Sequence, residues 1–298
     1  MLLDYLDDHL LREIATYLSD HDLNALVQTC RRTSGRLNND LYYRNIPSGE
    51  RPYVLEWAVD KNYIGTARLA VMMGASVAYT QERYNPVLVH AAIMGNLDMV
   101  SIVLAAFDVN VNITGMYGRT ALANACILND VPLVKLLMQH GGPGLDVELP
   151  DGCGMTPLMH AAQCRSIPLF QLLLATGRAS VHSRCIAGYT PLLHAITAAC
   201  ARYNAAECVE LLLQAGADPC ARDARDRTIL RHAVVCGRIE VVKKLLDTGK
   251  VDPDAEEGED GELDTAREMA KQHRTDAMER LLDNYKPVPL RISVELFY

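Results

Sequence analysis

The amino-acid sequence predicts an all-α protein in which pairs of short helices stack as tandem repeats behind a smaller helical module of another kind. Two observations indicate the repeats: a pattern that recurs every 33 to 38 residues, and an aromatic content of only 6% in a chain of 298 residues. Repeats too small to fold alone bury their apolar faces on their neighbours, and small aliphatic side chains suit that close packing. The third observation is that the pattern fails before residue 51, which predicts the separate module at 1–46.

The N-terminal module, residues 1–46, has apolar residues at helical spacing. One predicted helix carries a stripe of five of them, namely Leu6, Leu10, Leu11, Ile14 and Leu18. Ser19 and Asp22 have the spacing of a capping box, and a second helix with Leu23 and Val27 on its apolar stripe follows. A third short helix is expected near 34–41. A module of this size buries too little apolar surface to be reliably stable alone, so it needs the repeats or a partner to cover it.

Residues 51–285 contain seven copies of the repeat, each marked by a position that is Thr in the clearest copies. The seven marker positions are Tyr53, Pro86, Thr120, Thr156, Thr190, Thr228 and Thr265, and each is followed five places later by Ala. A second marker, Gly, lies 21 residues after the first in four copies, at Gly74, Gly141, Gly177 and Gly249. In the fifth copy, five extra residues around 199–204 delay this glycine to Gly216.

The chemistry of one copy predicts two helices joined by a turn. Thr accepts hydrogen bonds from the free amides at a helix start, and the Pro after it, as in Thr156-Pro157, suits the first helical position. The small Ala lets neighbouring helices approach closely. Apolar pairs at helical spacing, as in residues 133–137, predict the second helix. The following Gly is expected to end that helix in the left-handed conformation.

The period, the T-P-L-x-x-A signature and the run Gly216-Ala217-Asp218-Pro219 resemble the ankyrin repeat, over residues 51–285. The family's His directly follows T-P-L, whereas His160, His194 and His232 stand one place later, so the hydrogen bond usually assigned to that residue does not carry over. The resemblance implies a solenoid that binds a protein client with its hairpin tips and concave helix face. The client-binding residues nominated here are Tyr84, Tyr117, Met155, Tyr189 and Arg227. The alternative is that these side chains merely cover their own loops.

Residues 3–45 resemble an F-box in the Leu/Ile ladder, the start of the second helix and the Cys30-Arg31 ending, although Asp7 stands where that family has proline. The resemblance implies the substrate receptor of an SCF-type (Skp–cullin–F-box) ubiquitin ligase, with a Skp-family adaptor and a cullin ligase as partners. The adaptor-binding residues would be Leu6, Leu10, Leu11, Ile14, Leu18, Leu23 and Val27. The alternative is an ankyrin scaffold without a ligase link, whose N-terminus is a helical cap.

Composition excludes several classes of function. A net charge of −8 argues against a nucleic-acid-binding surface, and no apolar run approaches the ~18 residues that span a bilayer. The first residues lack the pattern of a secretory signal. The nine cysteines are odd in number and form no C-x-x-C pair, which favours free thiols in the cytoplasm or nucleus. We expect a monomer outside its complex.

The sequence indicates no enzyme, cofactor or metal site. It contains no nucleophile elbow, phosphate-binding glycine loop or H-E-x-x-H, so only an unrecognised Cys–His pairing would favour catalysis. The equivalent histidines of neighbouring repeats lie roughly 8–10 Å apart, too far to share one zinc ion. The acidic stretch 252–264 lacks the glycine and glutamate of a calcium loop and is expected to be a solvated loop. The tail 286–298 either covers the end of the stack or docks another chain.

Overall fold

The computed structural model describes most of the repeat region. The described residues are 54–72, 75, 77, 85–198, 205–255, 265–272 and 276–285. The F-box-like module with its seven predicted adaptor-binding residues, Tyr84, the insertion at 199–204 and the tail 286–298 lie outside them. The chain divides into two compact units, Met1–Leu149 and Pro150–Tyr298.

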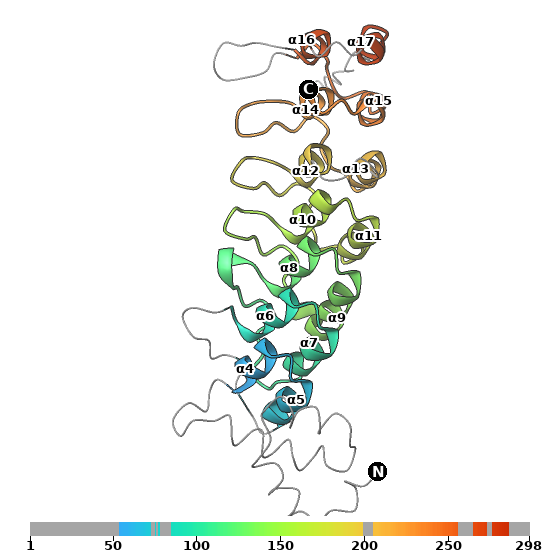
Figure 1. Ribbon diagram of the computed structural model, residues 1–298. Coiled ribbons are helices and arrows are strands. Elements are labelled where there is room, and N and C mark those ends of the chain that lie inside the picture. The colour runs from blue at the N-terminus through green and yellow to red at the C-terminus, as the bar shows by residue number, and fades with distance from the viewer. Residues whose placement is uncertain are drawn as a thin grey trace, which may run out of the picture. The chain divides into compact units, whose positions relative to one another are not determined.

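The described part of the first unit consists of three helix pairs in two layers (Figure 1). The inner layer holds the first helix of each pair, next to the loops that project from the unit, and the outer layer holds the second. The inner helices are α4 (Val54–Asp60), α6 (Val87–Ile93) and α8 (Ala121–Ile127), and the outer helices are α5 (Ile64–Met72), α7 (Leu97–Leu104) and α9 (Val131–Gly141). Two short 3-10 helices, η3 (Met116–Gly118) and η4 (Gly142–Gly144), lie in its loops.

The second unit repeats this arrangement with four described helix pairs. Its inner helices are α10 (Pro157–Cys164), α12 (Pro191–Thr197), α14 (Ile229–Val235) and α16 (Ala266–Gln272). Its outer helices are α11 (Ile167–Ala175), α13 (Ala205–Gln214), α15 (Ile239–Asp247) and α17 (Asp276–Asp283). Within the described residues the only β-type pairing is one isolated bridge between Arg222 and Thr228. The predicted all-α repeat fold is therefore confirmed.

The predicted helix starts are confirmed where the marker is Thr. The hydroxyls of Thr120, Thr156, Thr190 and Thr228 each accept a hydrogen bond from the amide three residues later, at 3.1–3.4 Å. Proline occupies the first helical position of α10 and α12, as expected. The Ala five places after each of these Thr residues is fully buried, with no exposed surface. These small side chains let consecutive inner helices of the same unit, such as α10 and α12, pack directly on one another.

One predicted helix end was wrong. Gly141 was expected to be left-handed, but it has φ −74° and α9 runs through it. Gly142 ends the helix instead, with φ 49° and ψ −135°. Pro143 explains the shift, because the residue before a proline is sterically kept out of the helical region, and only glycine adopts this alternative readily. Gly177, Gly216 and Gly249 are left-handed as predicted, with φ 64°, 91° and 65°.

Candidate functional site

Two hairpins of the second unit are built around a buried aspartate that binds a histidine. In hairpin 151–155, Asp151 Oδ1 accepts from the amides of Cys153 and Met155 at 2.9 and 3.0 Å. Its Oδ2 lies 3.1 Å from His160 Nε2, and both side chains are almost completely buried. Because the carboxylate accepts, this ring nitrogen carries the proton. His160, which stands one place later than the histidine of the family pattern, is therefore bonded to Asp151, five residues before Thr156.

Asp223 has the same role in hairpin 223–227 and one additional partner. Its Oδ1 accepts from the amides of Arg225 and Arg227, and its Oδ2 lies 3.0 Å from His232 Nε2 and 2.8 Å from Arg227 Nε. Burial raises the pKa of Asp223, but the Arg227 guanidinium and amide and the His232 ring outweigh burial and hold this pKa at about 2. Arg227, a predicted client-binding residue, is thus tied into its own hairpin.

The hairpin between them, 185–189, has Cys185 in place of the aspartate. The backbone is the same, since Cys185 N donates to Tyr189 O at 3.1 Å as Asp223 N does to Arg227 O at 3.0 Å. Gln163 Nε2 lies 3.4 Å from His194 Nδ1, and His194 Nε2 is buried without a hydrogen-bond partner. Burial, followed by the neighbouring His160, lowers the pKa of His194 to about 4. His194 is therefore buried and neutral, and only one of its two ring nitrogens has a hydrogen-bond partner.

The remaining predicted client-binding residues have different surroundings. The half-buried Tyr189 packs edge-on against His194 and His232, at centroid distances of 5.4 and 5.6 Å. Its hydroxyl lies 3.5 Å from Arg227 Nη2. Met155 is also half-buried, and its Sδ lies 3.9 Å from Gln163 Nε2. Tyr117 differs, because it is 72% exposed at a hairpin tip in the first unit.

The first unit exposes large apolar side chains that were not nominated from the sequence. We call Ile93, Met94, Leu97 and Leu128 the turn patch; these residues are 38–54% exposed and lie where an inner helix ends or the next outer helix begins. At the hairpin end of the unit, Met116 is 57% exposed beside Tyr117. The repeat register contained a signal for these residues, since Met94 and Leu128 both stand eight places after a marker position.

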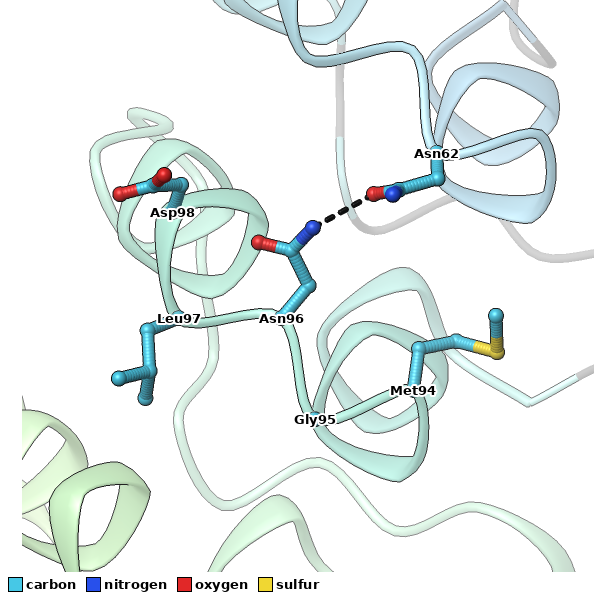
Figure 2. A pocket seen from close by; sticks show the side chains of 6 residues that line it. All are labelled: Asn62, Met94, Gly95, Asn96, Leu97 and Asp98. Atoms are coloured by element: carbon cyan, nitrogen blue, oxygen red, sulfur yellow. Dashed lines mark hydrogen bonds between the residues drawn. The ribbon is translucent and has the colours of Figure 1, made fainter.

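A shallow depression of ≈ 540 Å³ lies beside the turn patch, lined by Asn62, Met94, Gly95, Asn96, Leu97 and Asp98. Figure 2 shows Met94 and Leu97 on opposite sides of Asn96, whose amide donates to Asn62 Oδ1 at 2.6 Å. This bond ties the α4–α5 turn to the α6–α7 turn. Asp98 is the only ionisable lining residue, and the amides of Asn62 and Asn96 bond to each other, so few polar groups are left to orient a small molecule. Its open, mixed surface suits contact with another protein.

The described residues include no group of three or more His, Cys, Asp or Glu side chains that could hold a metal ion. Their seven cysteines are all free thiols. Burial raises the pKa of Cys208 to about 12, so this thiol stays protonated. Among the described helices, none combines the length and apolar character that crossing a bilayer requires.

Comparison with known proteins identifies the repeats. The family model described as ankyrin repeats (3 copies) matches residues 55–151, 143–223, 178–257 and 197–289. The E3 ubiquitin-protein ligase KEG of Arabidopsis thaliana is 30% identical over 132 residues, which are 44% of this chain and 8% of that protein. Ankyrin repeat protein nuc-2 of Neurospora crassa is 29% identical over 164 residues, 55% of this chain and 14% of that protein. The chain thus spans a small part of the length of these relatives.

The solved structures agree with this result at the level of the fold. The ankyrin repeat domain of Bcl-3, a member of the IκB protein family, superimposes with a TM-score of 0.64 at 24% identity. The superposition covers 80% of this chain and 100% of that domain.

Proposed function

The chain belongs to the ankyrin-repeat family, and we propose that it acts as a protein-binding receptor, the substrate-recognition subunit of an SCF-type ubiquitin ligase. The observation that supports a receptor role best is the turn patch, with Met116 and Tyr117 exposed separately at the hairpin end of the same unit. Single exposed apolar residues are normal on protein surfaces, whereas Met94 and Leu128 recur at the same position of consecutive repeats, which favours a binding face there. The relation to a plant protein named as an E3 ubiquitin-protein ligase is compatible with the ligase part of the proposal.

In this proposal the protein does no chemistry. The F-box-like residues from Leu6 to Val27 bind a Skp-family adaptor and through it a cullin, and the repeats hold the client. Bringing two reactants together on one assembly raises their effective concentration, which accelerates transfer without any catalytic side chain on the receptor.

The test is co-purification of the full chain with a Skp-family adaptor. We expect a stoichiometric complex that Leu10→Asp/Ile14→Asp abolishes, because a buried unpaired charge opposes burial of the apolar stripe. Thr16→Asp introduces one such charge on the same predicted helix away from the stripe, and it should keep the complex. Both variants must unfold at the same temperature as the unaltered chain, which shows that the repeats remain folded.

A second candidate is an ankyrin scaffold without a ligase link, favoured by Asp7 in place of the F-box proline. A folded full chain that does not bind the adaptor would support this candidate and contradict the ligase assignment.

Stability measurements separate the two tyrosines nominated for client contact. Tyr117→Ala should change the free energy of unfolding by less than about 1 kcal/mol, because its side chain is mostly exposed. Tyr189→Ala should cost about 2 kcal/mol, because its ring packs on His194 and His232. Urea unfolding of both variants measures the difference. Equal losses would contradict the assignment of Tyr117 to the client surface and of Tyr189 to the hairpin interior.

A further inference from the structure

Two neighbouring hairpins of the second unit carry guanidinium groups without a carboxylate partner. Arg184 is exposed; its Nη1 donates to the Gly188 carbonyl at 3.1 Å and also contacts the Arg222 carbonyl. Arg225 is exposed at the tip of hairpin 223–227 and makes no side-chain hydrogen bond or ion pair with the described residues. Within the described part of the chain, no carboxylate neutralises either group.

Comparison of the two hairpins explains why Arg184 and Arg225 have no carboxylate partner. Arg222 stands six residues before its Thr, as Arg184 does, and its Nη1 donates to the Asp226 carbonyl at 3.1 Å and to the Asp226 carboxylate at 2.7 Å. In hairpin 185–189 the position of Asp226 is occupied by Gly188. The other carboxylate, Asp223, is buried and bound by Arg227 and His232.

An exposed apolar residue lies in the same pair of hairpins as the two unneutralised cations. Hairpin 185–189 is tied to the hairpin on either side, because Ile186 N donates to Cys153 O at 3.0 Å and Ala224 N donates to Ala187 O at 3.1 Å. The packing is close, since a Cβ on Gly188 would lie 2.4 Å from Ala224 N. At the tip, the Ile186 side chain is 77% exposed; Arg184 lies two residues before it in sequence, and Arg225 lies in the next hairpin.

We propose that Arg184, Ile186 and Arg225 form a docking surface for an acidic segment of a protein client, in which carboxylates flank an apolar side chain. The proposal rests on the proposed function, because it specifies the class of client. Charge complementarity supports this docking surface, because each guanidinium keeps donors free for a carboxylate. Ile186 provides the apolar contact. The chain as a whole has a net charge of −8, so the rest of the molecule repels an acidic segment and favours this local orientation.

The probe is a short fluorescein-labelled peptide in which glutamates flank leucine, measured by fluorescence anisotropy on the full chain. We expect saturable binding that weakens as NaCl is raised, and at least about tenfold weaker binding of the counterpart with Gln for Glu. Arg184→Glu/Arg225→Glu should lower the affinity at least about tenfold, and Ile186→Ser at least about threefold. The matched control is Lys135→Glu at an exposed site on α9, which should leave binding within about twofold. Because Arg225 makes no side-chain bond among the described residues, Arg225→Glu alone keeps the test valid if the double variant unfolds.

Equal binding of the Gln counterpart, or unchanged binding by Arg225→Glu, would overturn the proposal. Peptide binding that appears only in a variant with neutral residues at five acidic positions would also overturn the proposal; these positions are Glu256, Glu257, Glu259, Asp260 and Glu262. That result would mean that the chain's own acidic stretch occupies the docking surface. The adaptor experiment is independent of these outcomes. If the adaptor complex forms and the peptide does not bind, only the docking surface is wrong; if the peptide binds as expected and the adaptor does not, only the ligase assignment is wrong.

Discussion

Replacement of Asp223 by alanine is expected to lower the free energy of unfolding by about 3–5 kcal/mol. The side chain is 1% exposed and is the common acceptor for two hairpin amides, the Arg227 guanidinium and the ring of His232. Alanine removes all four hydrogen bonds and leaves the hairpin amides and the His232 ring without this acceptor, whereas the Arg227 guanidinium is 27% exposed and binds water instead. The cost is large because an unsatisfied buried donor loses its hydration as well as its bond.

Urea unfolding at neutral pH measures this loss, with Asp218→Ala as the matched control. The Asp218 side chain is exposed and accepts a single hydrogen bond, from Cys220 N at 2.9 Å, so its replacement should cost less than about 1 kcal/mol. Similar losses for the two variants would show that the Asp223 network contributes little. The carboxylate of Asp223 has a pKa of about 2, below its ordinary 3.8. Its contribution is therefore complete above pH 3.8 and is lost as the pH falls through about 2.

Local chemistry made much of this fold predictable. Thr156 followed by Pro157 specifies a helix start from two adjacent residues, and the structure has the cap and the first helical residue in those places. The predicted left-handed conformation of Gly141 was wrong because Pro143, two residues later, restricts the backbone more strongly than the repeat pattern does. That constraint could have been found in the sequence, since proline restricts the residue before it.

The candidate site was less predictable because its contacts join different hairpins and helices. Tyr189 was nominated by residue type, but its ring contacts His232 of the following repeat, and no sequence spacing shows that contact. The partner of His160 is Asp151, nine residues earlier and across a hairpin turn. The sequence indicated that the hydrogen bond usual for the family's histidine does not carry over to His160. Only the structure identifies Asp151 as the acceptor of this histidine.

The acid sensitivity of the protein is expected to centre on His194, which should contribute a loss of about 3 kcal/mol in stability between pH 6.5 and pH 4. The pKa of His194 is lowered from 6.5 to about 4 by burial and then by His160, so in this range the unfolded chain binds a proton that the folded chain does not. The stabilisation is complete above pH 6.5 and is lost as the pH falls toward 4. The groups around the ring are Gln163, Tyr189 and His160, none of them an anion. Chemical denaturation at a series of pH values measures the slope.

Cys185→Asp tests the cause of this sensitivity, because it restores the residue that binds the histidine in the hairpins of Asp151 and Asp223. A cysteine side chain ends one atom earlier than an aspartate, so on the same backbone Cys185 falls short of the ring, whereas a carboxylate there is expected near 3 Å from Nε2, as in the other two hairpins. It would give the protonated ring a counterion, and we expect a shallower loss of stability below pH 6.5. Cys153→Asp, at an exposed hairpin position, adds the same charge without reaching a histidine and should leave the slope unchanged. If the two variants flatten the pH dependence equally, general charge rather than the missing acceptor controls it, and the explanation from His194 fails.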